Sequence, residues 1–235
     1  MSAAEQEEPR QLILDLPHLA ALGAEDFLIS QSNRKAVDLI DAWPRWPGPA
    51  IALCGPAGSG KSHLANVWRS RSGAPAVAAA SLCEAGLIEL ERRHAMVVED
   101  IDRGIGDERV LFHVLNLARE KGASVLITTE TPPGDLAIEL PDLRSRLRGL
   151  PLVMIEAPDE ALLKAVLVKL FADRQLPVEP HVIAHLALHM DRSMDAANRV
   201  VEAADRLALA RQRRVTRALA AEALEWVRGA ANQAE

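Results

Sequence analysis

Residues 55–62 read Gly-Pro-Ala-Gly-Ser-Gly-Lys-Ser and match the pattern GxxxxGK[ST] in full. A short apolar run, 50–54, precedes them, and a helical pattern with Leu64, Val67 and Trp68 on one face follows. Glycine lets backbone N–H groups turn inward around a phosphate, and the N-terminus of the following helix attracts its negative charge. Because this strand–loop–helix context is what the motif requires, it predicts an ATP or ADP site.

Within this motif, Lys61 is expected to reach the β- and γ-phosphates, and the Ser62 hydroxyl is expected to bind Mg²⁺. The alternative is a glycine-rich turn with a chance lysine. The predicted nucleotide-binding residues of this run are Gly55, Pro56, Gly58, Ser59, Gly60, Lys61, Ser62 and His63.

A second candidate site follows the apolar run 95–98, which predicts a buried strand ending in Glu99 and Asp100. In P-loop nucleotidases a carboxylate at such a strand end holds Mg²⁺ or orients the attacking water. Glu99 and Asp100 are therefore candidate catalytic residues, and Glu99 joins Ser62 as a candidate Mg²⁺ ligand. An acidic turn after a core strand is the alternative.

Five apolar runs position these motifs, and they lie near residues 50, 76, 96, 125 and 152. They alternate with helical stretches, which predicts a parallel sheet with helices on both faces. Ligands bind at the carboxyl ends of such strands. The run that ends at Thr129 should therefore bring this residue beside the nucleotide. The connector with Trp43 and Trp46 is predicted to pack on the sheet edge near the base pocket.

The pattern changes after Pro158, where four stretches with helical spacing predict a small all-helical domain. The expected fold class is α/β: a P-loop domain with a five-stranded parallel sheet, plus a helical lid. The predicted segments are a tail at 1–19, a nucleotide-binding domain at 20–158, the lid at 159–229 and a second tail at 230–235.

Composition narrows the class of protein. The chain has 235 residues, of which 49% are hydrophobic and 26% charged, with a net charge of −6, so no global attraction to nucleic acid is expected. Two cysteines argue against a disulfide framework. A secretory leader and an apolar run of membrane-spanning length are both missing, which predicts a cytoplasmic protein without a membrane contact.

One apolar segment lies outside these domains, in "RQLILDLP" at residues 10–17. It follows a polar leader and contains Leu12, Leu14 and Leu16. Two interpretations stay open: an edge strand of this protein's own sheet, or a tethered peptide for a groove on a partner. The polar leader and Pro17 favour the tethered peptide.

The chain as a whole resembles the AAA+ ATPases and, within them, the DnaA replication-initiator family, over roughly residues 20–228. "PDLRSRL" resembles the family's arginine-finger box and places the finger on Arg146. "MDRSMDAANRV" resembles the lid motif with the sensor-2 arginine, which falls on Arg192, and Thr129 and Glu130 fall on the sensor-1 position. The residues alone leave other interpretations open, namely a surface arginine at 146 and a solvated Arg192 paired with Asp191 or Asp195.

The missing DNA-reading domain and the short N-terminal peptide make the chain similar to the Hda group of DnaA-related regulators. That resemblance implies that Gln11, Leu12, Leu14 and Leu16 dock on the sliding clamp, the β subunit of DNA polymerase III. Two residues depart from the family patterns. Ile13 stands at the third position of the peptide, where the group usually has a small or acidic residue, and Glu99 stands where the initiators usually have aspartate.

The same resemblance implies a negative regulator of replication initiation that works in its ADP-bound form. It would stimulate ATP hydrolysis by DnaA through Arg146 supplied in trans, and would contact DNA only indirectly. Two alternatives remain: a helicase-loader type of AAA+ ATPase that hydrolyses its own ATP, and a nucleotide-binding module without partners. The sequence leaves a homodimer open.

Overall fold

The computed structural model describes residues 28–231, so the predicted clamp peptide at 11–16 lies outside the described residues. Five parallel strands form one sheet in the order β2-β3-β4-β1-β5. The strands are β1 Ala50–Cys54, β2 Ala76–Ala78, β3 Ala95–Glu99, β4 Ser124–Thr129 and β5 Leu152–Met154. All five lie where the apolar runs predicted them, which confirms the parallel α/β fold class.

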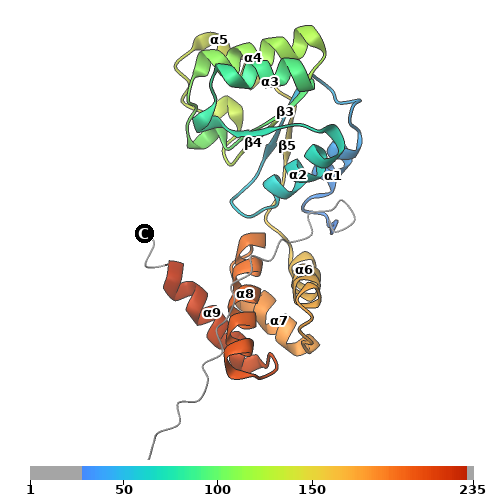
Figure 1. Ribbon diagram of the computed structural model, residues 1–235, viewed down its shortest axis with the longest axis vertical. Helices are drawn as coiled ribbons and strands as arrows, with labels where there is room; N and C mark the ends of the chain where they lie inside the picture. The colour runs from blue at the N-terminus through green and yellow to red at the C-terminus, as the bar shows by residue number, and fades with distance from the viewer. Residues whose placement is uncertain (1–27, 232–235) are drawn as a thin grey trace, which may run out of the picture.

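Helices cover both faces of this sheet (Figure 1). One face carries α1 and α2, and the other carries α3, α4 and α5. Their bounds are α1 Arg34–Asp41, α2 Lys61–Ser72, α3 Glu84–Arg93, α4 Glu108–Lys121 and α5 Pro141–Arg148.

Strand β1 shows why the sheet needs both layers. All five of its residues are buried, as expected for a parallel strand with helices on both sides. Ile51 and Leu53 pack with α1 and α2, while Ala50 and Ala52 pack with the other helical layer. The sheet thus divides the hydrophobic core into two clusters, and its strand ends are left to carry polar residues.

The remaining helices form a separate group with a hydrophobic cluster of its own (Figure 1). Two of them begin with a side-chain cap, since Asp159 accepts from the Leu162 N–H at 2.7 Å and Ser193 from the Ala196 N–H at 3.0 Å. The last helix ends at Ala231, two residues past 229, the expected end of the lid. The bounds are α6 Glu160–Asp173, α7 Pro180–His189, α8 Met194–Arg211 and α9 Arg217–Ala231.

The prediction for the tryptophan connector was wrong. Trp46 stacks on Trp68 of α2 with ring centroids 4.9 Å apart, and the Trp43 indole N–H donates to the Ser124 hydroxyl at 3.0 Å. Ser124 is the first residue of β4, so the connector lies at the end of the sheet opposite to the strand ends that bind ligands. Two half-buried indole rings, Trp43 and Trp46, pack against the buried Trp68, and no local sequence pattern encodes this contact.

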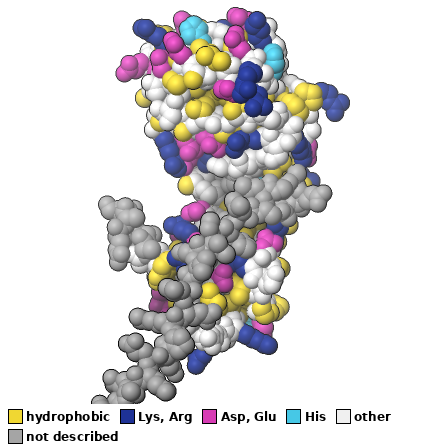
Figure 2. Space-filling model, in the orientation of Figure 1, with side chains coloured by type: hydrophobic (Ala, Val, Ile, Leu, Met, Phe, Trp, Pro, Cys, Tyr) yellow, Lys and Arg dark blue, Asp and Glu magenta, His cyan; other side chains and the backbone are white. Residues whose placement is uncertain are grey.

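The outer surface carries both signs of charge. Figure 2 shows acidic and basic side chains interspersed over the visible face of the sheet-bearing part. Within residues 28–231, no helix combines the length and the apolar character needed to cross a membrane.

Candidate nucleotide-binding site

The glycine-rich loop lies between the end of β1 and the start of α2. Cys54 pairs with Thr129 in the sheet, and the Gly55 N–H donates to the Thr129 carbonyl at 3.1 Å. The loop therefore begins beside the carboxyl end of β4. The structure brings Thr129 and the loop together, as the order of the strands required.

Three glycines of the loop occupy positions that other residues do not fit. Gly58 and Gly60 have φ angles of +67° and +101°, which L side chains rarely adopt. A Cβ atom on Gly55 would lie 2.4 Å from the Ile155 carbonyl oxygen. Backbone conformation and close packing thus require glycine at these three positions.

The polar side chains of the loop fit a polyphosphate. Lys61 is only 5% exposed, and its ammonium donates to the carbonyl oxygens of Gly55 at 2.7 Å and Pro56 at 3.0 Å. Ser59 is 4% exposed, and its hydroxyl has no hydrogen-bond partner within residues 28–231. A buried ammonium and an unpartnered buried hydroxyl in a glycine loop at a helix N-terminus are groups that a phosphate would satisfy.

Ser62 and His63 follow in the first turn of α2, where Ser62 is exposed and His63 is half-buried. The candidate Mg²⁺ ligand on the opposite strand, Glu99, is the last residue of β3, with β4 between it and β1. No group of three or more His, Cys, Asp or Glu residues that could hold a metal occurs in the described part of the chain. A metal here would depend on the nucleotide for further oxygen ligands.

Asp100 is held by its backbone. It has a φ angle of +56°, and its N–H donates to the Thr128 hydroxyl oxygen at 3.0 Å. The Thr129 hydroxyl donates to the Thr131 carbonyl at 2.6 Å. The hydroxyl of Thr128 therefore holds Asp100, whereas the hydroxyl of Thr129 binds within its own loop. The sequence pattern predicted no separate role for Thr128.

A further group of charges beside β4 was also missed. Arg103 pairs with Glu130 at 3.1 Å and lies 3.8 Å from Asp100, and the Glu130 N–H donates to Asp102 at 2.9 Å. Arg103 and Glu130 are 27 positions apart in the sequence, so no local pattern predicts their ion pair. Arg103 therefore lies beside one of the two candidate catalytic carboxylates, Asp100, and no ion pair joins it to the other, Glu99, within the described residues.

Cys54 adds no reactive group to this site. Its thiol donates to the Glu130 carbonyl at 3.3 Å, and burial raises the pKa of the Cys54 thiol. A thiol with a raised pKa is a poor nucleophile at neutral pH. Cys54 acts here as a small core side chain.

The lid motif contacts the loop directly. The Met194 N–H, at the start of α8, donates to the Gly58 carbonyl at 2.7 Å. A Cβ atom on Gly58 would lie 2.5 Å from the Ser193 Cβ. Arg192 therefore lies two residues from a hydrogen bond to the loop.

Arg192 itself is exposed. Its positive charge, after the hydrogen bond from Lys164, lowers the pKa of Glu160 at the start of α6. Asp195 pairs with Arg199 at 3.1 Å, and Arg192 has no ion-pair partner within the described range. The alternative in which Asp191 or Asp195 holds this arginine is thus not what the structure contains.

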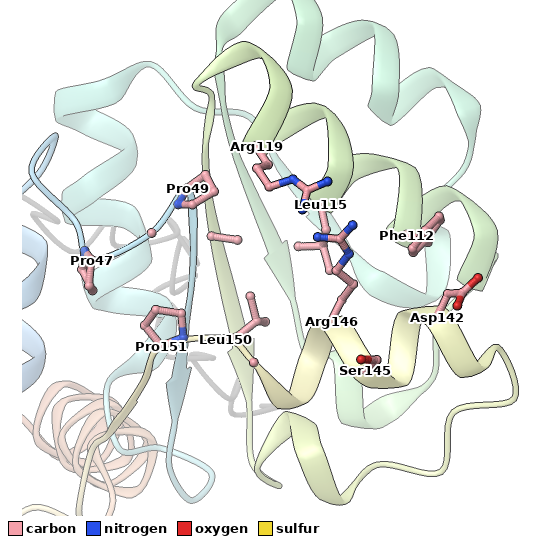
Figure 3. Close-up of a pocket in the computed structure, with 13 residues that line it drawn as sticks. Pro47, Pro49, Phe112, Leu115, Arg119, Asp142, Ser145, Arg146, Leu150 and Pro151 are labelled. Atoms are coloured by element: carbon pink, nitrogen blue, oxygen red, sulfur yellow. The ribbon is translucent and has the colours of Figure 1, made fainter.

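Arg146 lies elsewhere. It lines a pocket with Ala50, the first residue of β1, and Pro151, the residue before β5 (Figure 3). This is the amino end of the sheet, whereas the loop follows the last residue of β1. The structure therefore does not bring Arg146 together with the other predicted site residues of the same chain.

The three arginines of α5 differ in what they bind. The Arg144 Nε donates to the Ile138 carbonyl at 3.1 Å, and the Arg148 Nε to the Gly134 carbonyl at 3.4 Å. The Arg146 guanidinium has no hydrogen bond within residues 28–231, and its Cζ lies 5.9 Å from the centroid of the Phe112 ring. Of the three, Arg146 keeps its donors available.

No protein-family model and no curated protein matches this chain. Three solved structures are similar in fold. Domain III of the replication initiation protein DnaA from Thermotoga maritima has a TM-score of 0.72 at 17% identity, over 87% of this chain and 95% of that one. AMPPCP-bound DnaA from Aquifex aeolicus has a TM-score of 0.63 at 20% identity, over 76% of this chain and 63% of that one. The RuvB Holliday junction branch migration motor of Thermotoga maritima has a TM-score of 0.64 at 18% identity, over 84% of this chain and 69% of that one.

These similarities show the fold: this chain shares its parallel sheet and its separate group of helices with the DnaA and RuvB structures. The chain spans less than two thirds of the length of the Aquifex DnaA chain.

Proposed function

We propose that this chain is a negative regulator of replication initiation, which stimulates ATP hydrolysis by the initiator DnaA through Arg146 supplied in trans. The observation that carries the proposal is the place of Arg146. It lies at the amino end of the sheet, away from the P-loop of its own chain, and its guanidinium has no hydrogen bond to residues 28–231. An arginine that cannot reach its own nucleotide can still serve the nucleotide of a neighbour.

The chemistry suits a guanidinium. Hydrolysis of ATP spreads negative charge over the oxygens of the transferred phosphoryl group, and a planar donor fork stabilises that charge. An arginine supplied in trans is worth about 10³–10⁵ in rate. The AAA+ fold shared with DnaA supports a neighbour of this kind, since AAA+ chains of similar shape can lie side by side.

The chain's own nucleotide has a regulatory place in this proposal. Lys61, Ser59 and the loop glycines bind ADP or ATP, and Ser62 with Glu99 holds Mg²⁺ beside it. Support comes from the buried, unpartnered Ser59 hydroxyl and from the AMPPCP bound to the Aquifex DnaA of similar fold. With ADP bound, Arg192 and the start of α8 close on the loop. This closure fixes the position of the lid helices that is competent to bind the partner chain.

The tail peptide completes the proposal. Gln11, Leu12, Leu14 and Leu16, all outside the described residues, dock on the sliding clamp in the cytoplasm, so that DNA is contacted only indirectly. Burying each leucine contributes about 1.5–3 kcal/mol. Ordering the tail costs about 2–5 kcal/mol. The balance is a weak and reversible contact, which suits a tether.

The decisive test replaces Arg146 by alanine. We expect stimulation of DnaA's ATP hydrolysis on clamp-loaded DNA to fall close to background, while ADP binding and clamp binding stay at the wild-type level. Arg148→Ala is the matched control on the same helix and should keep most of the stimulation. If Arg146→Ala stimulates like the wild type, the trans mechanism is wrong.

The tether is tested separately by replacing the four predicted clamp residues with alanine. Capture of the chain by purified clamp should be lost, and the melting temperature should change little. A fall of more than about 5 °C would mark the segment as part of the fold, because ~1 kcal/mol shifts a domain of this size by about 2–4 °C.

A second function has one observation in its favour. Glu99 and Asp100 end a strand near the P-loop strand, which is where an ATPase of the helicase-loader type needs its carboxylates. Steady ATP turnover by the isolated chain, lost in Glu99→Gln with ADP binding retained, would favour this self-sufficient ATPase. If the isolated chain does not turn over ATP, the result favours the regulator over the self-sufficient ATPase.

A further inference from the structure

Two arginines share the pocket at the amino end of the sheet, and one of them has no role so far. The pocket has a volume of about 800 Å³ and lies between α4, α5, the first residue of β1 and the residues just before β5. Figure 3 shows Arg119, from α4, and Arg146, from α5, extending to the same side of the pocket beside Leu115. We call this the two-arginine pocket.

The positive charge of the pocket is not compensated. In the described part of the chain, the Arg119 guanidinium has neither a hydrogen bond nor an ion pair, and the Arg146 guanidinium has only its contact with the Phe112 ring. Asp142 is the one acidic residue that lines the pocket, and it pairs with neither arginine. Guanidinium groups stay charged at all relevant pH values, so the two repel one another until an anion lies between them.

The lining also has the right donors and walls for a phosphate chain. Phe112, Leu115 and Arg119 lie at i, i+3 and i+7 of α4 and so share one face of that helix. The Ser145 hydroxyl adds a neutral donor from α5, and Leu150 lies on the apolar side. Two planar forks bind phosphate oxygens better than a single ammonium does, because each can donate two parallel hydrogen bonds.

The ligand must come from another molecule. The chain's own P-loop follows Cys54, while the pocket includes Ala50 at the other end of the same strand. At about 3.3 Å per residue, β1 alone separates the two by on the order of 13 Å. A nucleotide on the P-loop cannot bridge that distance through the sheet.

We infer that Arg119 and Arg146 together bind a polyphosphate, and that the two-arginine pocket receives the triphosphate of a nucleotide held by a second AAA+ chain. The inference rests on the proposed function for the identity of that chain. It adds Arg119 as a second phosphate-binding residue, so that Arg146 does not act alone. A triphosphate carries enough charge to neutralise both guanidinium groups, whereas a single carboxylate does not.

The first experiment measures the pocket without a partner. The full-length chain, saturated with ADP so that the P-loop is filled, is titrated calorimetrically with inorganic tripolyphosphate at constant ionic strength. We expect binding that weakens about tenfold to a hundredfold in both Arg119→Ala and Arg146→Ala, the loss typical of a charge-assisted contact. Arg109→Ala is the matched control: it is an exposed arginine of the same helix that does not line the pocket.

Equal binding by all four proteins, or no binding by the wild type, would overturn the inference. Folding of each variant is checked by its melting temperature and by its affinity for ADP, which should both stay at the wild-type level because the two ends of the sheet are separate.

The second experiment identifies the source of the polyphosphate. Stimulation of DnaA's ATP hydrolysis should fall about tenfold or more in Arg119→Ala, recover in part in Arg119→Lys because a point charge remains, and stay unchanged in Arg109→Ala. If the wild type stimulates and Arg119→Ala stimulates equally well, the inference fails and the proposed function stands. If the wild type binds tripolyphosphate but does not stimulate, the proposed function fails and the pocket takes a free polyphosphate instead.

Discussion

The two ends of the β-sheet differ in how their polar groups are satisfied. At the carboxyl end, Lys61 donates to two loop carbonyls, Asp100 donates to Thr128, and Arg103 pairs with Glu130. At the amino end, Arg119 and Arg146 share a pocket without a hydrogen-bond partner in residues 28–231. One end is a closed network of short contacts, and the other is an open pair of like charges.

This difference indicates which end serves the chain and which serves a neighbour. A site for the protein's own ligand gains from a rigid frame, because the frame holds the donors in place before the ligand binds. An arginine meant for another molecule has to keep its donors unpaired until the two meet. If this view is right, substitutions at the closed end will cost stability or ADP affinity, and those at the open end will cost neither.

The largest effect is expected from Gly58→Ala. The new Cβ would lie 2.5 Å from the Ser193 Cβ at a φ angle of +67°, so strain and overlap add to a loss of about 2–5 kcal/mol in the free energy of unfolding. Urea denaturation measures it. Gly149→Ala at the open end meets nothing closer than 3.6 Å and should cost less than ~1 kcal/mol.

A control separates strain from overlap in that comparison. Gly73 has nearly the same φ angle, +69°, and no atom within 4 Å of an added Cβ. Gly73→Ala should therefore show the strain alone, about 1–2 kcal/mol. Equal losses for Gly58→Ala and Gly73→Ala would mean that the contact between the lid and the loop is looser than 2.5 Å implies.

The next effect is expected from Lys61→Ala. Loss of the buried ammonium should weaken ADP binding by about 1.5–3 kcal/mol, or roughly 10- to 150-fold, because the contact with phosphate is charge-assisted. Calorimetry with ADP measures the change. Lys35→Ala, at an exposed residue of α1, is the control. Tripolyphosphate binding at the open end should stay the same. If Lys61→Ala binds ADP as tightly as the wild type does, residues 55–62 are not the nucleotide-binding loop.

The smallest effect is expected from Ser59→Ala. Its hydroxyl is buried without a partner, so removing it should raise the stability of the ADP-free protein by about 1 kcal/mol or leave it unchanged. The stabilisation that added ADP provides should shrink at the same time, since one donor to the ligand is gone. Melting temperatures with and without ADP give both quantities. A clear loss of stability without ADP would show that the hydroxyl is satisfied within the fold.

The strands and the loop were predictable from sequence because their signals are local. Residues 50–54 and 125–127 are continuous apolar runs, as expected for buried parallel strands. Residues 55–62 match a motif whose glycines are required by the backbone conformation or by close packing. The order of these elements then placed Thr129 at the loop without further information.

What the sequence did not reveal depends on packing between distant segments. Arg103 and Glu130 meet across 27 positions, and Arg119 meets Arg146 only because α4 packs on α5. Phe112 and Arg119 are seven residues apart and share one face of α4, but this spacing does not tell which element that face contacts. The tryptophan connector was misplaced for the same reason, since its partner Trp68 lies in another helix.

The hydrogen bond from Met194 to Gly58 has a mechanical consequence. It fixes the first residue of α8 to the loop, and α8 has 18 residues, so the helix is about 27 Å long. Its far end, Arg211, is tied to Glu222 of α9. A tilt of about 10° at the loop would move that far end by about 5 Å. The helix thus works as a lever arm, and a shift of a few tenths of an ångström around a phosphate becomes a displacement that a neighbouring molecule can sense.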